Sequence, residues 1–219
     1  MKTAFKAQSL YLKNSTRVPV LKSTDTISIF QESIKGWHAR QEPAVNPYGE
    51  NSINFLLFKK NQIDTIQWHK EDEIRRTDLP AMAFVELKRS IDQLNQQRTD
   101  LVELIDDHFM EMFALYPVLD GARLNSETPA WMIDRMSILE LKIWHMQEQT
   151  ERTDVSEAHL SQSAAKLQIL LSQRTDLAAC LDELQAERIN GTAMFKVYRQ
   201  MKMYNDKTLN PSLYEKGAQ

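Results

Sequence analysis

Apolar residues recur at intervals of three and four along most of this chain, which is the spacing of one face of an α-helix. The first such run begins after Asp25, a residue type that favours helix N-termini. Its apolar positions are Ile27, Phe30, Ile34 and Trp37. Two prolines and a glycine interrupt the pattern over 41–51 and predict a loop there.

The pattern continues in longer runs that predict further helices, and no proline occurs between Ala130 and Asn210. Helix starts are indicated at Asp78, Pro129 and Asp154, and a stop at the pair Asn190-Gly191. The helices are expected over 52–75, 80–116, 129–150, 154–190 and 193–204. The chain is therefore predicted to be all-α, with an N-terminal arm over 1–24 and a single helical domain over 25–219.

Two stretches of the chain resemble two later ones at the same separation. WHKEDEIRRTD at 68–78 aligns with WHMQEQTERTD at 144–154, and QRTDLVELID at 97–106 aligns with QRTDLAACLD at 173–182, both at an offset of 76. A repeat of 53–107 in 129–183 predicts two helical hairpins related by a pseudo-twofold axis, an up-down four-helix bundle with additional N- and C-terminal helices. Coincidence between helical segments of similar composition is the alternative.

Composition and charge exclude several classes of protein. Of the 219 residues, 42% are apolar and 26% are charged, and the net charge of −3 argues against nucleic-acid binding. No stretch approaches the ~20 apolar residues of a membrane span. The lone Cys180 excludes an internal disulfide and is expected to be a small core residue. Together with an N-terminus that lacks a secretory signal, these features predict a cytoplasmic protein.

Two arginines occupy apolar stripes, where a buried charge needs a partner. Arg98 lies between Leu94 and Leu101, and Arg174 lies between Leu170 and Leu177. Two interpretations remain open. The arginines either form internal ion pairs that fix the helix register, or they line a cationic pocket for a ligand that carries phosphate or carboxylate.

Residue counting along straight antiparallel helices brings further polar residues to the level of these arginines. Arg135 would join Arg98 and Arg174 in holding the anion, while Tyr204 and Asn205 on a basic C-terminal helix would close the site. Asp134 would orient an arginine or act as a base, which makes it the candidate catalytic residue. The pocket is expected to take a small anionic ligand.

Two Trp-His pairs form a second group of candidates. His69 and His145 each precede an acidic residue by three positions, Asp72 and Glu148 respectively. This order is the reverse of the Glu-x-x-His motif of di-iron bundles, so packing near helix ends is the favoured interpretation. We therefore expect no metal and no other cofactor, and these four residues are the candidate ligands should a metal bind.

Four stretches together resemble an uncharacterised bacterial family, domain of unknown function 4254. They are WHKED at 68–72, IDQLNQQRTDLVELID at 91–106, NSETPAWMIDRMSILELKIWHM at 125–146 and YRQMKMYNDKTLNPSLY at 198–214. The resemblance covers most of the chain from about residue 25 and implies an all-helical fold. Genes of such proteins often lie near glycosyltransferases of envelope polysaccharide loci, which implies a phosphosugar or nucleotide-sugar ligand.

The expected function combines these observations. The protein is expected to bind a small anionic metabolite in cytoplasmic cell-envelope glycan metabolism, and whether it also converts that metabolite is left open. The alternative is a non-catalytic scaffold that docks on an envelope-biosynthesis enzyme, with the arginines purely structural. Association with a second copy of the chain is compatible with both.

Overall fold

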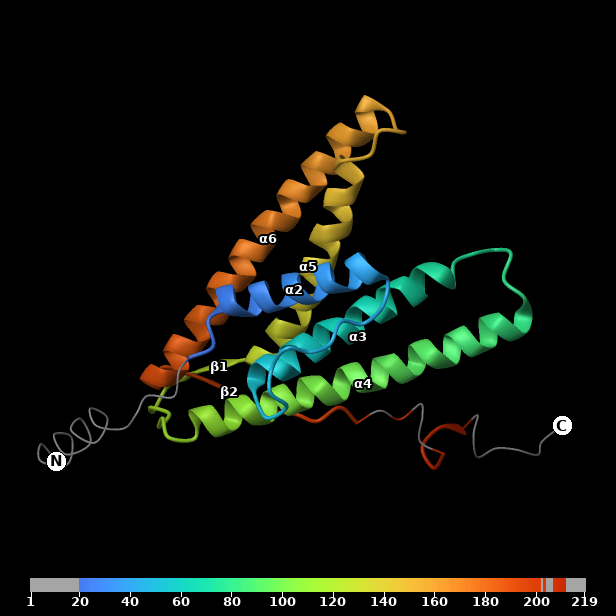
Figure 1. Cartoon of the computed structure of the whole chain (residues 1–219). Helices are drawn as coiled ribbons and strands as arrows, with labels where there is room; N and C mark the ends of the chain where they lie inside the picture. Colours follow the sequence, from blue (N-terminus) through green and yellow to red (C-terminus); the bar gives the residue numbers. More distant parts are fainter. Residues whose placement is uncertain (1–19, 202, 204–206, 212–219) are drawn as a thin grey trace, which may run out of the picture.

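The computed structural model describes residues 20–201, 203 and 207–211, and within these ranges almost all regular structure is helical. Figure 1 shows the arrangement. The helices are α2 (Ser23–Arg40), α3 (Ile53–Glu73), α4 (Ala81–Phe113), α5 (Pro129–Thr150) and α6 (Glu157–Asn190), and the strands are β1 (Arg123–Asn125) and β2 (Ala193–Phe195). The prediction of an all-α protein is therefore confirmed.

Side-chain caps explain where three of the helices begin. The hydroxyl oxygens of Ser52, Thr128 and Ser156 accept hydrogen bonds from backbone N–H groups in the first turns of α3, α5 and α6, respectively. Three predicted caps are wrong, because Asp25 lies inside the first turn of α2, and Asp78 and Asp154 each precede the N-cap residue of α4 and α6 by two positions. The caps formed by Ser52, Thr128 and Ser156 satisfy backbone N–H donors that a helix leaves unpaired at its start.

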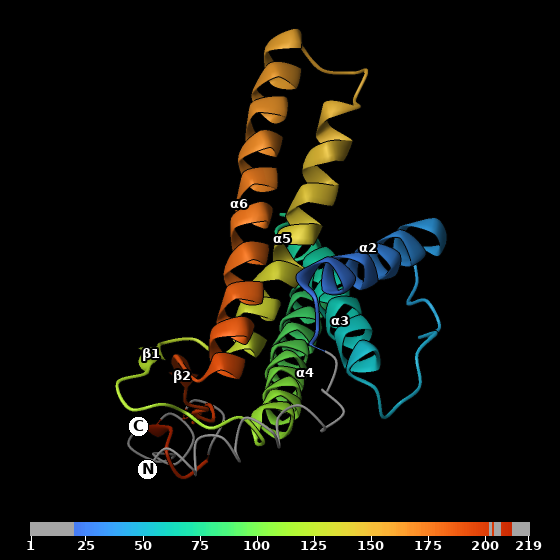
Figure 2. The same cartoon turned by 90° about the vertical axis from the view of Figure 1, so that its left-hand side faces the viewer.

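The four later helices form two antiparallel hairpins. α3 packs against α4 and α5 packs against α6, and the hairpins diverge from a common base. α2 lies across both and contacts α3, α5 and α6. In the view of Figure 2 the far half of the α5–α6 hairpin projects beyond the rest of the fold. The expected helical hairpins are thus present.

The helix starts follow the offset of the sequence repeat. α3 and α5 begin at residues 53 and 129, and α4 and α6 begin at residues 81 and 157, so both pairs are separated by 76. Asn61 and Ser137, which are also 76 residues apart, donate and accept one hydrogen bond of 3.0 Å across α3 and α5. Equivalent positions of the two hairpins therefore meet inside the protein.

The apolar core lies at the base, where α2, α3, α4 and α5 come together. Its largest fully buried side chains include Phe30, Phe58, Phe109 and Phe113. α6 contributes less, since its buried residues are limited to Ser163, Leu181, Leu184 and Gln185. Cys180 is exposed, so its assignment to the core is wrong. The reason is that Cys180 lies on the solvent-facing side of α6, although the next residue, Leu181, is fully buried in the core.

The expected helix over 193–204 is wrong for the residues that the structure describes there. After Gly191 ends α6 with a φ of 77°, residues 193–195 form β2, which pairs in parallel with β1. Ala193 and Phe195 are buried while Met194 between them is half-buried, and this alternation is that of a strand. Burial of Ala193 and Phe195 on one face favours the extended conformation of this segment over the helix that its apolar spacing predicts.

The start of the folded domain lies earlier than expected. Leu21 is buried, and its carbonyl oxygen accepts a hydrogen bond of 2.9 Å from the Gln185 side chain. Ser23 donates to both carboxylate oxygens of Asp182, through its backbone N–H and its hydroxyl. Residues 21–24 therefore belong to the packed domain and not to an arm; residues 1–19 of the expected arm lie outside the described residues. Within the described ranges, none of the helices is both long and apolar enough to span a bilayer.

Candidate functional site

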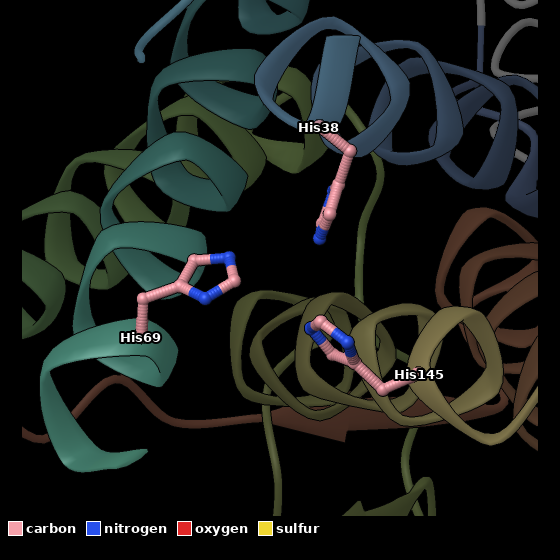
Figure 3. A group of neighbouring side chains, drawn as sticks. All are labelled: His38, His69 and His145. Carbon is pink, nitrogen blue, oxygen red and sulfur yellow. The ribbon is translucent and has the colours of Figure 1, made fainter. Parts of the chain in front are cut away.

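Three helices each carry the dipeptide Trp-His close to their C-terminal ends. The histidines are His38 on α2, His69 on α3 and His145 on α5, and Figure 3 shows their rings turned toward one another. One ring nitrogen from each histidine lies within 4.8 Å of the others. Residues far apart in the sequence thus form one cluster, which we call the histidine centre.

Hydrogen bonds at Nδ1 leave Nε2 available in two of the three imidazoles, those of His38 and His145. Nδ1 of His38 lies 2.8 Å from the carbonyl oxygen of Ile34, and Nδ1 of His145 lies 2.8 Å from a carboxylate oxygen of Glu148. Because those oxygens only accept, both Nδ1 atoms carry the proton and Nε2 keeps its lone pair in the neutral ring. Nε2 of all three histidines is buried and has no hydrogen-bond partner among the described residues.

Tryptophan rings hold the three imidazoles in a cycle. Trp37 of α2 stacks on His69, Trp68 of α3 stacks on His145, and Trp144 of α5 packs on His38, with ring centroids 5.5, 4.9 and 4.8 Å apart. Each tryptophan therefore contacts the histidine of another helix. This arrangement fixes the planes of the rings and ties the three helices together.

The local electrostatics keep His69 neutral. Burial lowers the pKa of His69, and the neighbouring imidazoles His38 and His145 lower it further, while the more distant carboxylates Asp72 and Glu148 act in the opposite direction. The C-terminal ends of three helices also lie near the cluster, and their partial negative charge favours a bound cation. A neutral imidazole is the form that ligates metals.

His69 and His145 were candidate ligands from the sequence, whereas His38 was not. The signal was present, because Trp37-His38 repeats the same dipeptide at the end of a third predicted helix. Three of the five histidines and three of the four tryptophans of the chain meet here. Of the acidic candidates, Glu148 orients His145, whereas Asp72 is exposed beside His69.

A second cluster of charged side chains is buried between α3, α4 and α5. Lys60 is fully buried and forms salt bridges with Asp64 and, at 2.9 Å, with Asp134. Arg98 donates to both oxygens of Asp134 from Nε and Nη2, at 2.8 and 2.6 Å. Ser137 donates to Asp64 at 2.5 Å. Two cations and two carboxylates therefore balance in one network.

The pKa values of the two carboxylates in this network shift in opposite directions. Burial raises the pKa of Asp64, an effect that Lys60 and Arg98 reduce but do not cancel. Burial also acts to raise the pKa of Asp134, but there the two cations outweigh it and the pKa is lowered. Asp134 therefore remains the ionised anchor of Arg98, and Asp64 is the first of the pair to take up a proton.

The structure brings together only part of the expected arginine site. Arg98 and Asp134 meet as expected, but Arg174 lies 3.6 Å from Glu140 in the other hairpin, and Arg135 pairs with Glu127 at the surface. Arg98 of α4 and Arg174 of α6 do not meet because the two hairpins diverge, which counting along straight helices leaves out. Tyr204 and Asn205 lie outside the described residues.

The ion pairs of the two arginines nevertheless occupy equivalent positions. Nε of Arg98 lies 3.5 Å from Asp64, and Nη1 of Arg174 lies 3.6 Å from Glu140. Asp64 and Glu140 are 76 residues apart in the sequence, and so are Arg98 and Arg174. Each hairpin therefore contains one arginine–carboxylate pair between its two helices, whereas Lys60 and Asp134 extend the pair into a network only in the first hairpin.

The fold and the two clusters define an all-helical protein with a histidine centre at the junction of two hairpins. The chain belongs to the family described as "Protein of unknown function (DUF4254)", which it matches over residues 54–197. That match includes His69 and His145. It includes neither α2 nor residues 198–214, one of the four stretches that carry the resemblance to this family. No curated protein and no solved structure matches the chain.

Proposed function

We propose that this protein binds one divalent transition-metal ion at the histidine centre. The observation that carries the proposal is the convergence of three buried, unpartnered Nε2 atoms from three helices. A buried polar atom without a partner is costly, and the Nε2 atoms of His38 and His145 carry no hydrogen in the tautomers that their Nδ1 contacts select. A metal ion would satisfy all three lone pairs at once.

The donor set favours zinc among the common ions. Imidazole nitrogens suit Zn²⁺, Cu²⁺, Ni²⁺ and Fe²⁺, whereas Mg²⁺ and Ca²⁺ prefer oxygen ligands. Zn–N bonds of about 2.0–2.1 Å require ligand nitrogens roughly 3.3–3.4 Å apart in a tetrahedral site. The nitrogens now lie within 4.8 Å of one another, so small rotations of the rings bring them onto the ion.

Three protein ligands leave one coordination position for water or an anion. Structural zinc sites have four protein ligands, while catalytic ones usually have three and an open position. A metal at this position would polarise a bound ligand and lower the pKa of bound water. A cavity of about 350 Å³, lined by Trp68, Lys142, His145 and Leu170 among others, provides space beside the centre. The chain's own contribution is to orient the imidazoles through Glu148 and the tryptophans.

Metal titration of the full chain tests the proposal. Metal-free protein is titrated with Zn²⁺ by calorimetry and with Co²⁺ by visible absorption, which reports tetrahedral coordination. We expect one ion per chain. His38→Gln, His69→Gln and His145→Gln should each lose more affinity than the 10–100-fold typical of outer-shell changes. Zn²⁺ at 100 times its Kd should stabilise the fold by about 2.7 kcal/mol.

Two other histidines supply matched controls. His108 on α4 and His159 on α6 are also half-buried but lie outside the centre, so His108→Gln and His159→Gln should leave the affinity unchanged. The proposal is wrong if the native chain takes up no Zn²⁺, Co²⁺, Ni²⁺ or Cu²⁺. It is equally wrong if the three central variants bind as tightly as the two controls.

We also propose that the two hairpins are related by a pseudo-twofold axis. The equal 76-residue offsets of the helix starts, of the ion pairs Asp64–Arg98 and Glu140–Arg174, and of the contact between Asn61 and Ser137 support this relation. An experimental structure tests it by superposition of 53–107 on 129–183. A best fit that is out of register by more than one helical turn would exclude it.

A further inference from the structure

A second ligand site, separate from the histidine centre, is indicated on one side of Arg98. The Arg98 side chain is the one member of the buried network that reaches solvent, with 29% of it exposed, whereas Lys60 and Asp64 are fully covered. Cavities of about 350 and 340 Å³ open on its two sides. Arg98 therefore connects a preorganised internal network to two open spaces.

The hydrogen bonds of Arg98 leave part of its guanidinium available. A guanidinium has five N–H donors, and Asp134 takes one from Nε and one from Nη2. Nη1 has no hydrogen-bond partner among the residues that the structure describes. Because Asp134 fixes one edge of the planar group, the remaining donors are held in place before a ligand arrives, which lowers the entropic cost of binding.

The two cavities differ in charge. One cavity is lined by the carboxylates of Asp64, Glu71 and Asp72, which outnumber its two cations, Arg98 and Arg75, and Arg75 already pairs with Glu71. The larger one contains no carboxylate except that of Asp134, whose two oxygens are already bonded to Arg98. Its other walls are neutral or aromatic and comprise Asn95, Thr99, Val102, Trp131 and Gln200. An anion is therefore favoured on the Trp131 side of Arg98.

The C-terminal segment closes one wall of this cavity. Arg199 donates to the backbone oxygen of Glu103 at 3.1 Å and pairs with Asp107, and the backbone N–H of Gln200 donates to Glu103 at 3.1 Å. These bonds hold Gln200 against α4, where it lines the cavity. The expected basic C-terminal helix does not form in the described residues, where Arg199 pairs with acidic residues of α4.

We infer that Arg98 binds the oxyanion of a small phosphate- or carboxylate-bearing ligand in the cavity lined by Trp131 and Gln200. Arg98 would donate from its free edge, and Trp131 would pack against the remainder of the ligand. The inference needs no metal and stands apart from the histidine centre.

Titration of the metal-free full chain with inorganic phosphate and with succinate tests the inference and separates the two oxyanion types. Arg174 provides a matched control, because it occupies the equivalent repeat position, is 28% exposed and also pairs with one buried carboxylate. Arg98→Gln and Arg98→Lys should weaken oxyanion binding at least about tenfold, whereas Arg174→Gln should leave it unchanged. Gln200→Ala alters only the cavity wall and should weaken binding without affecting the fold.

Three outcomes would overturn the inference. One is the absence of saturable binding of both phosphate and succinate to the native chain. Another is an equal loss of affinity in the Arg98 and Arg174 variants, which would indicate a general charge effect. The third is unchanged binding in Arg98→Lys and Gln200→Ala with circular dichroism like that of the native protein. His69→Gln changes the histidine centre and should leave oxyanion binding unchanged. Failure of the metal proposal can therefore be distinguished from failure of this inference.

Discussion

Substitution of Lys60 by Met tests whether the buried ionic network behaves as a balanced unit. The ammonium group is fully covered and bridges Asp64 and Asp134, whose side chains are 0% and 5% exposed. Removing it leaves two carboxylates in the interior with Arg98 as the one remaining cation among them. Loss of one partner of a buried ion pair typically costs about 3–5 kcal/mol. For a chain of this length the melting temperature should fall by about 6–20 °C.

The chain offers a surface pair with the same sequence spacing as a control. Lys88 and Asp92 form an i, i+4 salt bridge like Lys60 and Asp64, but their side chains are 54% and 48% exposed. Lys88→Met should therefore cost only about 0.3–0.5 kcal/mol. Urea unfolding at constant m-value gives both free energies of unfolding. The reasoning is refuted if the two substitutions cost the same within about 0.5 kcal/mol.

The pH dependence of the Lys60→Met variant provides an independent check. The pKa of Asp64 is already raised in the native fold, chiefly by burial, and loss of Lys60 removes the main opposing charge. An acid whose pKa is higher in the folded than in the unfolded state loses stability as the pH rises and regains it as the pH falls. The deficit of Lys60→Met should therefore shrink below neutral pH, and Asp64→Asn in the same chain should remove that dependence.

Three further outcomes are expected. Gly191→Ala should destabilise the fold by at least about 1 kcal/mol more than Gly121→Ala. Both glycines have φ near 80°, but of the two only Gly191 would place a Cβ 2.6 Å from a backbone oxygen. Equal losses of unfolding free energy in urea would contradict this. Burial lowers the pKa of His108, so stability should fall as the pH drops through about 6.5, and His108→Gln should flatten that slope. Glu148→Ala should weaken Zn²⁺ binding about 10–100-fold in calorimetry, whereas Glu151→Ala should not.

Local sequence signals predicted the helices well because each helix depends on its own spacing and breakers. The glycine stop at residue 191 and the loop over 41–51 are such signals, and both occur in the structure. The segment after Gly191 was misjudged because its partner, β1, lies about 70 residues earlier in the chain. A parallel pairing over that separation leaves no periodic trace in a three-residue strand.

The sites were harder to predict because they depend on how the hairpins sit in space. Arg98 and Asp134 were correctly brought together, since both lie near the common base where straight-helix counting holds. Arg174 was assigned to the level of Asp134 and instead meets Glu140, which lies six residues further along α5. The divergence of the hairpins keeps α6 and its Arg174 away from Arg98 of α4. Lys60 went unnoticed since one lysine within an apolar helix face resembles a residue that extends to solvent.

The cyclic stacking of the histidine centre has a consequence for which parts of the chain the centre needs. Each hairpin contributes one Trp-His pair, so a single repeat unit possesses one ligand and no cross-helix ring contact of this kind. Even two hairpins supply only two ligands, because His38 arrives with α2, which precedes the family match at residue 54. The three-histidine arrangement therefore requires both hairpins and α2 together. A relative that has both hairpins but no histidine at the position of His38 would lack the third ring nitrogen of the proposed metal site.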